Sequence, residues 1–239
     1  MVDPFDGSLG YPIPQLPPID VVAVTHEHTD HNNIHLAVGS PTIIYGLSDD
    51  GWHPQHFTCD DLSVKVIAGA YHDMSKGCER GRTALMSIET GGVRVLHLGD
   101  LGHELDVNLL AQCKDHSVVL VPIGGCFTIN GVAAGHVIDA ISPEISIPMH
   151  YKTPAVPSSP LARLGDSEFL NNRLVRYLET DCLRLKKVDL APRGGIVVPQ
   201  LPPLIHTRNQ PQQPDDKSRR GCSLGHRTEP RGPRRPAPI

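Results

Sequence analysis

The residues of this 239-residue chain that are best suited to chemistry are its 14 histidines and the aspartates beside some of them. The densest group is the sequence His-Glu-His-Thr-Asp-His, which begins at His26 and directly follows an apolar run over residues 21–25. In an extended segment alternate side chains point to the same side, so His26 and His28 can reach one metal ion. Asp30 follows the same alternation, and a turn can bring His31 round to a second ion. Zinc and other first-row divalent ions favour imidazole and carboxylate ligands, so the segment predicts a metal site.

Short β-branched runs and a few amphipathic segments predict the elements that must position such a site. Gly, Asp or Pro separates the runs, as is typical of strands. The strands come first in series and later alternate with helices, which favours an α+β sandwich flanked by helices over a regular βαβ series. Asn130 is a suitable N-cap for the second helix. The predicted strands are residues 21–25, 42–45, 63–67, 84–89, 93–98, 117–121, 145–148 and 195–198, and the predicted helices are residues 103–113, 131–141 and 167–178.

Composition and charge narrow the classes of protein to consider. Hydrophobic residues make up 39% of the chain and aromatic residues 4%, which predicts a core of Val, Ile, Leu and Ala. The formal net charge of −4 argues against nucleic acid as a partner. We expect no membrane span and a cytoplasmic protein, because no apolar run is long enough and residues 1–18 lack a signal segment. The six cysteines form no C-x-x-C pair, so we expect reduced, mostly buried thiols rather than metal ligands.

The character of the chain changes at about residue 201. Residues 201–239 contain eight prolines, eight Lys or Arg and three Asp or Glu, with almost no apolar periodicity. A segment of this composition buries too little apolar surface to fold, so we expect a disordered tail rich in Pro and Arg. Residues 1–200 are therefore predicted to form the one folded domain.

The motifs and their order resemble those of the metallo-β-lactamase superfamily. The pattern His-x-His-x-Asp-His at residues 26–31 is the signature of that superfamily. The other expected elements occur in the expected order, and they are Asp3-Pro4, His72, Asp100 and His150. Several sequences, among them Leu-Gly-Asp at residues 98–100, are similar to a bacterial branch of metal-dependent hydrolases that includes ascorbate-phosphate lactonase-like proteins. The resemblance covers residues 3–153 and implies an αββα sandwich.

This resemblance also implies a chemistry. It implies two divalent metal ions, with zinc expected and Mn²⁺ or Fe²⁺ as alternatives, and a hydroxide held by the metals as the nucleophile. Asp100 would bridge the two ions, and Asp30 could also orient the hydroxide. The substrate would be a small molecule, anionic ones included, and the reaction would hydrolyse an ester, a lactone or a phosphodiester. The first metal would be held by His26, His28 and His72, and the second by Asp30, His31 and His150.

Charged residues after His72 could shape the site further. Lys76, Arg80 and Arg82 flank a glycine-containing loop and could contact an anionic substrate, although a solvated loop has the same sequence character. Asp73 could accept a hydrogen bond from a ligating imidazole, or it could simply occupy a turn.

The chain departs from the superfamily pattern at its start. Relatives usually have two further strands before the Asp-Pro element, whereas only two residues precede Asp3-Pro4 here. We therefore expect a sandwich that lacks its first two strands and exposes a sheet edge. Two functions stay open, an active dinuclear metallohydrolase and a truncated, non-catalytic metal-binding protein that retains the ligand set.

Overall fold

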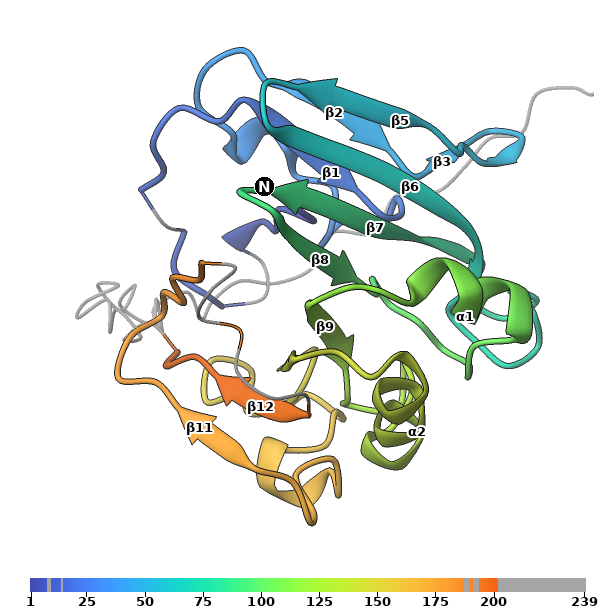
Figure 1. The fold of residues 1–239 in the computed structure, drawn as a ribbon, viewed down its shortest axis with the longest axis vertical. Helices are drawn as coiled ribbons and strands as arrows, with labels where there is room; N and C mark the ends of the chain where they lie inside the picture. The colour runs from blue at the N-terminus through green and yellow to red at the C-terminus, as the bar shows by residue number, and fades with distance from the viewer. Residues whose placement is uncertain (8–9, 14, 187–189, 191–193, 202–239) are drawn as a thin grey trace, which may run out of the picture. The chain divides into compact units, whose positions relative to one another are not determined.

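The computed structural model describes residues 1–201 except 8–9, 14, 187–189 and 191–193. Its main element is a mixed eight-stranded sheet (Figure 1). The first four strands of this sheet along the chain pair antiparallel, and the remaining neighbours pair parallel. In order across the sheet, the strands are β11 (Val175–Tyr177), β12 (Gly195–Val198), β10 (Ile145–Met149), β9 (Val118–Pro122), β8 (Val93–His97), β7 (Arg82–Thr90), β6 (Leu62–Tyr71) and β5 (His56–Cys59).

Separate apolar clusters cover the two faces of this sheet. On one face lies a parallel pair, β1 (Val21–Val24) and β2 (Thr42–Tyr45), whose side chains pack on β6 and β7. On the other face lie α1 (Val107–Cys113) and α2 (Gly131–Ile141), which contact β6 and β9 respectively (Figure 1). This arrangement is the α+β sandwich that the sequence predicts. Short elements complete it, namely the hairpin of β3 (Leu47–Ser48) and β4 (Gly51–Trp52) and the 3₁₀ helices η2 (Ile34–Leu36) and η3 (Leu164–Asp166).

Most of the predicted elements are confirmed. Each of the eight predicted strands overlaps an observed one, and the helix predicted over residues 131–141 coincides with α2. Asn130 is its N-cap, because its side-chain oxygen accepts a hydrogen bond from the backbone N–H of Ala133 at 3.0 Å. The helix predicted from residue 103 begins later, at Val107, because Asp106 caps it through the N–H of Leu109 at 2.8 Å.

The helix predicted over residues 167–178 is wrong. This stretch forms turns and then β11. Glu168 and Asn172 have φ angles of 61° and 58°, which an α-helix cannot include. Tertiary contacts favour the turns over helical periodicity, since Phe169 is buried in the core and Arg173 donates two hydrogen bonds of 2.8 Å to Asp139 of α2.

The prediction of mostly buried cysteines is also wrong. Among the described residues, five cysteines carry free thiols, and only Cys113 is buried. Burial raises the pKa of the Cys113 thiol to about 12, so this residue behaves as a small apolar side chain of the core. The other four are exposed because they lie in turns and at strand ends rather than on core-facing positions.

The small β1–β2 sheet has two strands, but the edge of β1 is not left open. Residues 1–3 run beside it, and Val2 forms an isolated parallel bridge with Ala23. The N–H of Ala23 donates to the carbonyl of Met1 at 2.9 Å, and the N–H of Asp3 donates to the carbonyl of Ala23 at 2.9 Å. Residues 1–3 therefore satisfy backbone groups of β1, while the edge exposure expected beside Asp3-Pro4 stays a prediction.

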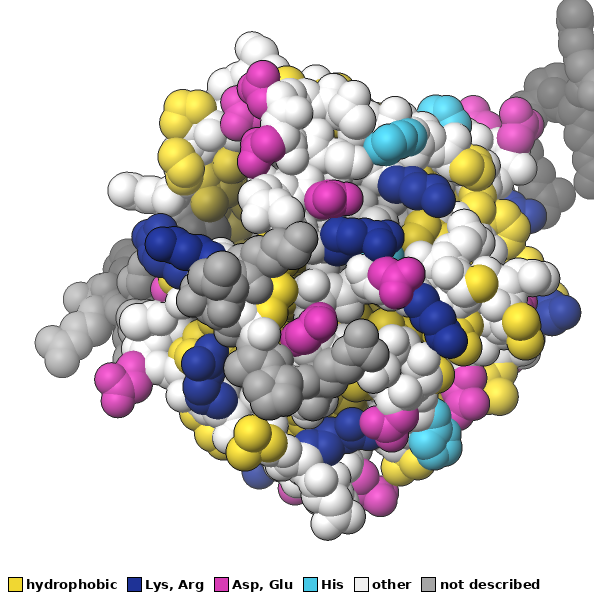
Figure 2. Space-filling view, in the orientation of Figure 1, with side chains coloured by type: hydrophobic (Ala, Val, Ile, Leu, Met, Phe, Trp, Pro, Cys, Tyr) yellow, Lys and Arg dark blue, Asp and Glu magenta, His cyan; other side chains and the backbone are white. Residues whose placement is uncertain are grey.

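The surface of the described part carries mixed charges. On the face shown in Figure 2, acidic and basic side chains are interspersed rather than gathered into one patch. No helix within the described part of the chain is both long enough and apolar enough to span a bilayer. The tail predicted to be disordered after residue 201 lies outside the described residues, so it stays a prediction.

Candidate metal centre

The predicted ligands come together because of the direction in which the strands run. β6 and β8 are both antiparallel to β7, and β10 is parallel to β8 through β9. The carboxyl ends of these three strands therefore meet at one edge of the sheet. His72 follows β6, Asp100 follows β8 and His150 follows β10, so their side chains converge there. β1 brings the His26 segment to the same place from the facing layer.

Asp100 occupies the centre of the group. Its Oδ2 lies 3.5 Å from His150 Nε2, 3.8 Å from His72 Nδ1 and 4.0 Å from His26 Nε2. Its Oδ1 lies 3.6 Å from His31 Nε2. These separations are too long for hydrogen bonds. They are close to the roughly 3.4 Å that separates two ligand atoms on one tetrahedral ion with bonds of about 2.0–2.2 Å.

The ligand atoms fall into two groups that share this carboxylate. Within each group the atoms lie within 4.8 Å of one another. The first group contains His26, His28, His72 and Asp100, and the second contains His31, Asp100 and His150; a further set, Asp3, His26 and His31, lies beside them. The superfamily resemblance implies the same first set, but its second set also includes Asp30, so the assignment to two metal ions stays a prediction.

Asp30 joins the second group only through one contact. Its Oδ2 lies 3.6 Å from His31 Nε2, and its side chain is 35% exposed, against 7% for Asp100. His28 is likewise exposed, while the rings of His26 and His72 are buried. The cluster therefore has a closed side formed by the strands and an open rim formed by residues after β1.

A hydrogen-bonded chain below the cluster orients two of the imidazoles. The Thr25 hydroxyl donates to Asp3 Oδ2 at 2.7 Å, so it can only accept from His26 Nδ1 at 2.8 Å. His31 Nδ1 donates to the same Asp3 oxygen at 3.2 Å. The His26 ring therefore carries its proton on Nδ1 and leaves its Nε2 free, while the His31 ring is held through Nδ1 with its Nε2 directed at Asp100. A carboxylate that fixes the tautomer of histidine in this way is typical of metal ligands.

The electrostatics of the cluster keep two of its imidazoles, those of His26 and His72, neutral. Burial, followed by the neighbouring imidazoles, lowers the pKa of His26 far below its usual value, and burial lowers the pKa of His72 to about 4. His31 is the exception. Burial opposes its charged form, but the hydrogen bond to Asp3 and the nearby Asp100 and Asp30 outweigh it and raise the pKa of His31 to about 9.

Three buried nitrogens in the cluster have no hydrogen-bond partner. They are both ring nitrogens of His72 and Nδ1 of His150. Leaving a buried polar atom unpaired costs about 1–3 kcal/mol, so such atoms are rare in stable cores. A divalent cation would satisfy lone pairs of this kind, and the donor set of imidazole and carboxylate fits zinc or another first-row ion.

Two glycines allow the backbone to bring Asp100 this close. Gly99 has a φ of 51°, and a Cβ there would lie 2.7 Å from the Thr83 hydroxyl. Gly102 packs on the backbone of His72, where a Cβ would lie 1.9 Å from the His72 carbonyl oxygen. The N–H of Gly102 also donates to the carbonyl of Tyr71 at 2.8 Å. These contacts join the loop after β8 to the end of β6.

Asp73 has a role that sequence reasoning only partly anticipated. It is buried, and its carboxylate accepts backbone N–H groups of Gly77, Glu79 and Arg80 at 3.0, 3.3 and 2.9 Å. Burial alone would raise the pKa of Asp73, but these hydrogen bonds lower it. The residue therefore organises the loop after His72 instead of orienting an imidazole.

The three basic residues of this loop separate in the structure. Arg80 stacks on Phe127, with its guanidinium carbon 4.1 Å from the ring centroid. Arg82 lies over Trp52 and lines, with Lys76, a cavity of about 280 Å³. Only Arg80 reaches a neighbour of the cluster, because the Phe127 ring meets His150 edge-on at 6.5 Å.

Sequence reasoning missed Thr25 and Phe127. In the sequence Thr25 is only the last residue of a predicted strand. A hydroxyl directly before the first histidine of the motif is nevertheless a usable signal for a group that orients that histidine. Phe127 offered no such signal, since an aromatic residue in a loop can serve many purposes.

We expect Thr25→Val to lower metal affinity by roughly 10- to 100-fold, as is typical when a group that orients a ligating histidine is lost. Valine has a similar shape but cannot accept the hydrogen bond from His26 Nδ1. Thr25→Ser is the matched control, because it keeps the hydroxyl. Competition with a fluorescent zinc chelator measures the effect, and equal affinities for the two variants would contradict this role.

Comparison with known proteins agrees with the geometry. Residues 1–150 match the model of the beta-lactamase superfamily domain. A UPF0173 metal-dependent hydrolase of Staphylothermus marinus is 31% identical over 152 residues, which cover 56% of this chain and 64% of that protein. A UPF0173 metal-dependent hydrolase of Alkaliphilus metalliredigens is 29% identical over 181 residues, which cover 67% of this chain and 81% of that protein. The chain thus spans slightly less than two thirds of the first of these relatives.

A solved structure from Thermotoga maritima supports the same assignment. It is described as a candidate zinc-dependent hydrolase of the metallo-β-lactamase superfamily, and it is 27% identical to this chain. The alignment covers 82% of this chain and 87% of the other, with a TM-score of 0.58. The sequence match over residues 1–150 includes the converging strands that carry the cluster. The chain belongs to the metallo-β-lactamase superfamily.

Proposed function

We propose that the protein is a metal-dependent hydrolase that uses two divalent ions, with zinc as the expected metal. The observation that carries this proposal is the position of Asp100 between two groups of imidazoles whose buried nitrogens lack partners. The names of the Staphylothermus and Alkaliphilus relatives support the general activity. His26, His28 and His72 would hold one ion, His31, His150 and Asp30 would hold the other, and Asp100 would contact both.

The chain's own residues have distinct tasks in this proposal. Asp3 and Thr25 hold the Nε2 atoms of His31 and His26 toward the cluster. Asp30 lies at the open rim, where its carboxylate is partly exposed. There it can accept a hydrogen bond from a water molecule and so orient it. The ions would lower the pKa of water and polarise the oxygen of a carbonyl or phosphoryl group. No serine or cysteine nucleophile is required.

The proposed substrate is a small ester, lactone or phosphodiester. The superfamily fold alone does not select among these, because one metal core can serve many reactions. The free thiols of the described cysteines fit a reducing compartment, which supports the cytoplasm as the proposed location.

The test combines metal analysis with a substrate panel. The full chain, purified without chelator and then reconstituted with Zn²⁺, Mn²⁺ or Fe²⁺, is expected to bind about two equivalents and to hydrolyse at least one class in the panel. Elemental analysis gives the stoichiometry. Two equivalents of metal without any turnover would favour the non-catalytic metal-binding alternative, and less than a quarter of an equivalent would refute the metal centre itself.

A further inference from the structure

We propose that Arg80 binds an anionic oxygen group of the substrate, a carboxylate or a phosphate, beside the metal centre. This inference rests on the proposed hydrolase function and narrows its substrate class. It is carried by the position of the guanidinium group, its fixed orientation and its lack of an acidic partner.

The backbone of Arg80 is fixed relative to His72. Asp73 follows His72 directly and accepts the N–H of Arg80 at 2.9 Å. The N–H of His72 donates to the carbonyl of Gly81 at 3.1 Å. The loop therefore closes on itself at both ends, and Arg80 is held next to a residue of the first ligand group.

The side chain of Arg80 is directed toward the second ligand group. Its guanidinium carbon lies 4.1 Å from the centroid of the Phe127 ring, a distance typical of a cation–π contact. The Phe127 ring in turn meets His150 at 6.5 Å with an interplanar angle of 87°. Arg80 thus lies between the loops that carry His72 and His150.

Arg80 has no acidic partner among the described residues. Arg173 shows the contrast, because it forms a two-pronged pair with Asp139. Within the described part of the chain, the guanidinium of Arg80 makes no ion pair or side-chain hydrogen bond, and the residue is half-buried. A cation held this close to a site for two divalent cations is repelled by them. An anion lying between them would offset that repulsion.

The geometry selects the kind of anion. A guanidinium group presents parallel N–H donors that match the two oxygens of a carboxylate or phosphate. Contact with the Phe127 ring restrains the group before binding, so it loses less freedom when an anion binds. A substrate with a carboxylate or phosphate near its scissile bond would therefore be bound by Arg80 while the metal centre acts on that bond.

Two esters with one leaving group test this specificity. The zinc-loaded full chain is assayed with 4-nitrophenyl acetate, which is neutral, and with mono-4-nitrophenyl succinate, which carries a carboxylate. Arg80→Gln is expected to raise KM for the succinate ester by roughly 10- to 100-fold, the range for a lost charge-assisted pair, and to change the acetate reaction less than about twofold. Arg80→Lys should recover part of the loss.

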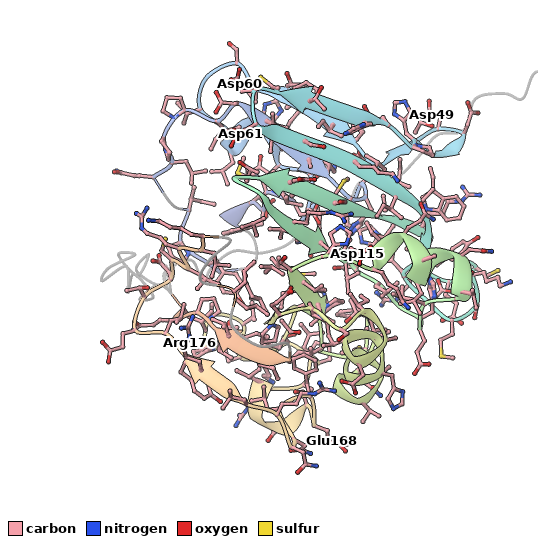
Figure 3. The ribbon with its side chains drawn as sticks, viewed as in Figure 1. Asp49, Asp60, Asp61, Asp115, Glu168 and Arg176 are labelled. Atoms are coloured by element: carbon pink, nitrogen blue, oxygen red, sulfur yellow. The ribbon has the colours of Figure 1, made fainter. Side chains whose placement is uncertain are left out.

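The control is Arg176→Gln, which makes the same change of charge at an exposed position of β11, the edge strand of the sheet (Figure 3). This variant should leave the kinetic constants for both esters unchanged. If Arg80→Gln raised KM equally for the two esters, or for neither of them, the inference would be overturned.

A binding measurement separates this inference from the proposed function. Calorimetric titration of the zinc-loaded protein with inorganic phosphate should give a dissociation constant that rises about tenfold or more in Arg80→Gln but not in Arg176→Gln. If phosphate binding depends on Arg80 while neither ester is hydrolysed, the anion site stands and the hydrolase proposal fails. Absence of phosphate binding, or binding that is unchanged in Arg80→Gln, would overturn the anion site.

Discussion

Asp100→Asn is expected to lower the rate of hydrolysis by roughly 10³-fold, which corresponds to about 4 kcal/mol of transition-state free energy. Asparagine keeps the size of the side chain but removes its charge and one of its two anionic oxygens. In the structure those oxygens face histidines of both ligand groups, Oδ2 toward His150, His72 and His26 and Oδ1 toward His31. The variant should therefore also retain less than one of the two expected equivalents of metal.

The matched control for this variant is Asp49→Asn. Asp49 is exposed in the β3–β4 hairpin, away from the converging strand ends (Figure 3). The same change of charge there should leave kcat/KM and metal content within about twofold of the parent. If Asp100→Asn kept full activity and two equivalents of metal, the bridging role would be ruled out.

A histidine variant adds an independent check. His26→Ala should abolish hydrolysis, whereas His136→Ala should not, because His136 is exposed and pairs with Glu104 on the surface. His116 is a poor control even though it lies outside the cluster. It is buried, and it bridges the Ser87 hydroxyl at 2.7 Å and the Cys113 carbonyl at 2.8 Å, so its loss would damage the fold.

Removing the metal is expected to lower the melting temperature by about 8–16 °C. A ligand that binds only the folded state at roughly 1,000 times its dissociation constant stabilises it by about 4 kcal/mol. For a domain of this size each kcal/mol corresponds to about 2–4 °C. The physical reason is that the folded chain holds five imidazoles together around Asp100, and buried nitrogens of His72 and His150 have no hydrogen-bond partner. Differential scanning calorimetry before and after dialysis against a chelator measures the shift.

The pH dependence of the metal-free protein gives a more specific signature. His26 and His72 have folded-state pKa values below the usual 6.5, so the unfolded chain binds more protons than the folded one as the pH falls. The free energy of unfolding therefore falls as the pH drops below 6.5, and for His72 this fall continues to its folded-state pKa of about 4. His31 has the opposite effect on stability, because its folded-state pKa is raised to about 9. Its contribution to the free energy of unfolding is lost as the pH rises through that value.

The metal-free protein should consequently be most stable near pH 6.5. Reconstitution with zinc should remove the decline toward pH 9, since a metal on Nε2 of His31 replaces the proton that is otherwise lost there. Chemical denaturation between pH 5 and pH 9 checks both curves. Identical profiles with and without zinc would contradict the assignment of His31 to the metal centre.

Local sequence largely determined the positions of eight of the twelve strands in the described part of the chain. The eight predicted strands were recovered because short β-branched runs bounded by Gly, Asp or Pro have few alternatives. The motif around His26 and His28 was also sufficient to predict metal chemistry, because three histidines and an aspartate at that spacing have few structural uses. α2 was predictable to the residue, since its N-cap Asn130 is encoded beside it.

Long-range packing decided the rest. The turns between residues 167 and 174 replace a predicted helix because Phe169 and Arg173 find partners in the core and on α2, and local periodicity carries no information about them. The placement of Arg80 against Phe127 joins residues from two loops that only the tertiary structure brings together. Sequence by itself determined which chemical groups this protein brings to its centre. Their mutual distances were decided by the order and direction of the strands, because a site built from four strand ends exists only after the sheet has formed.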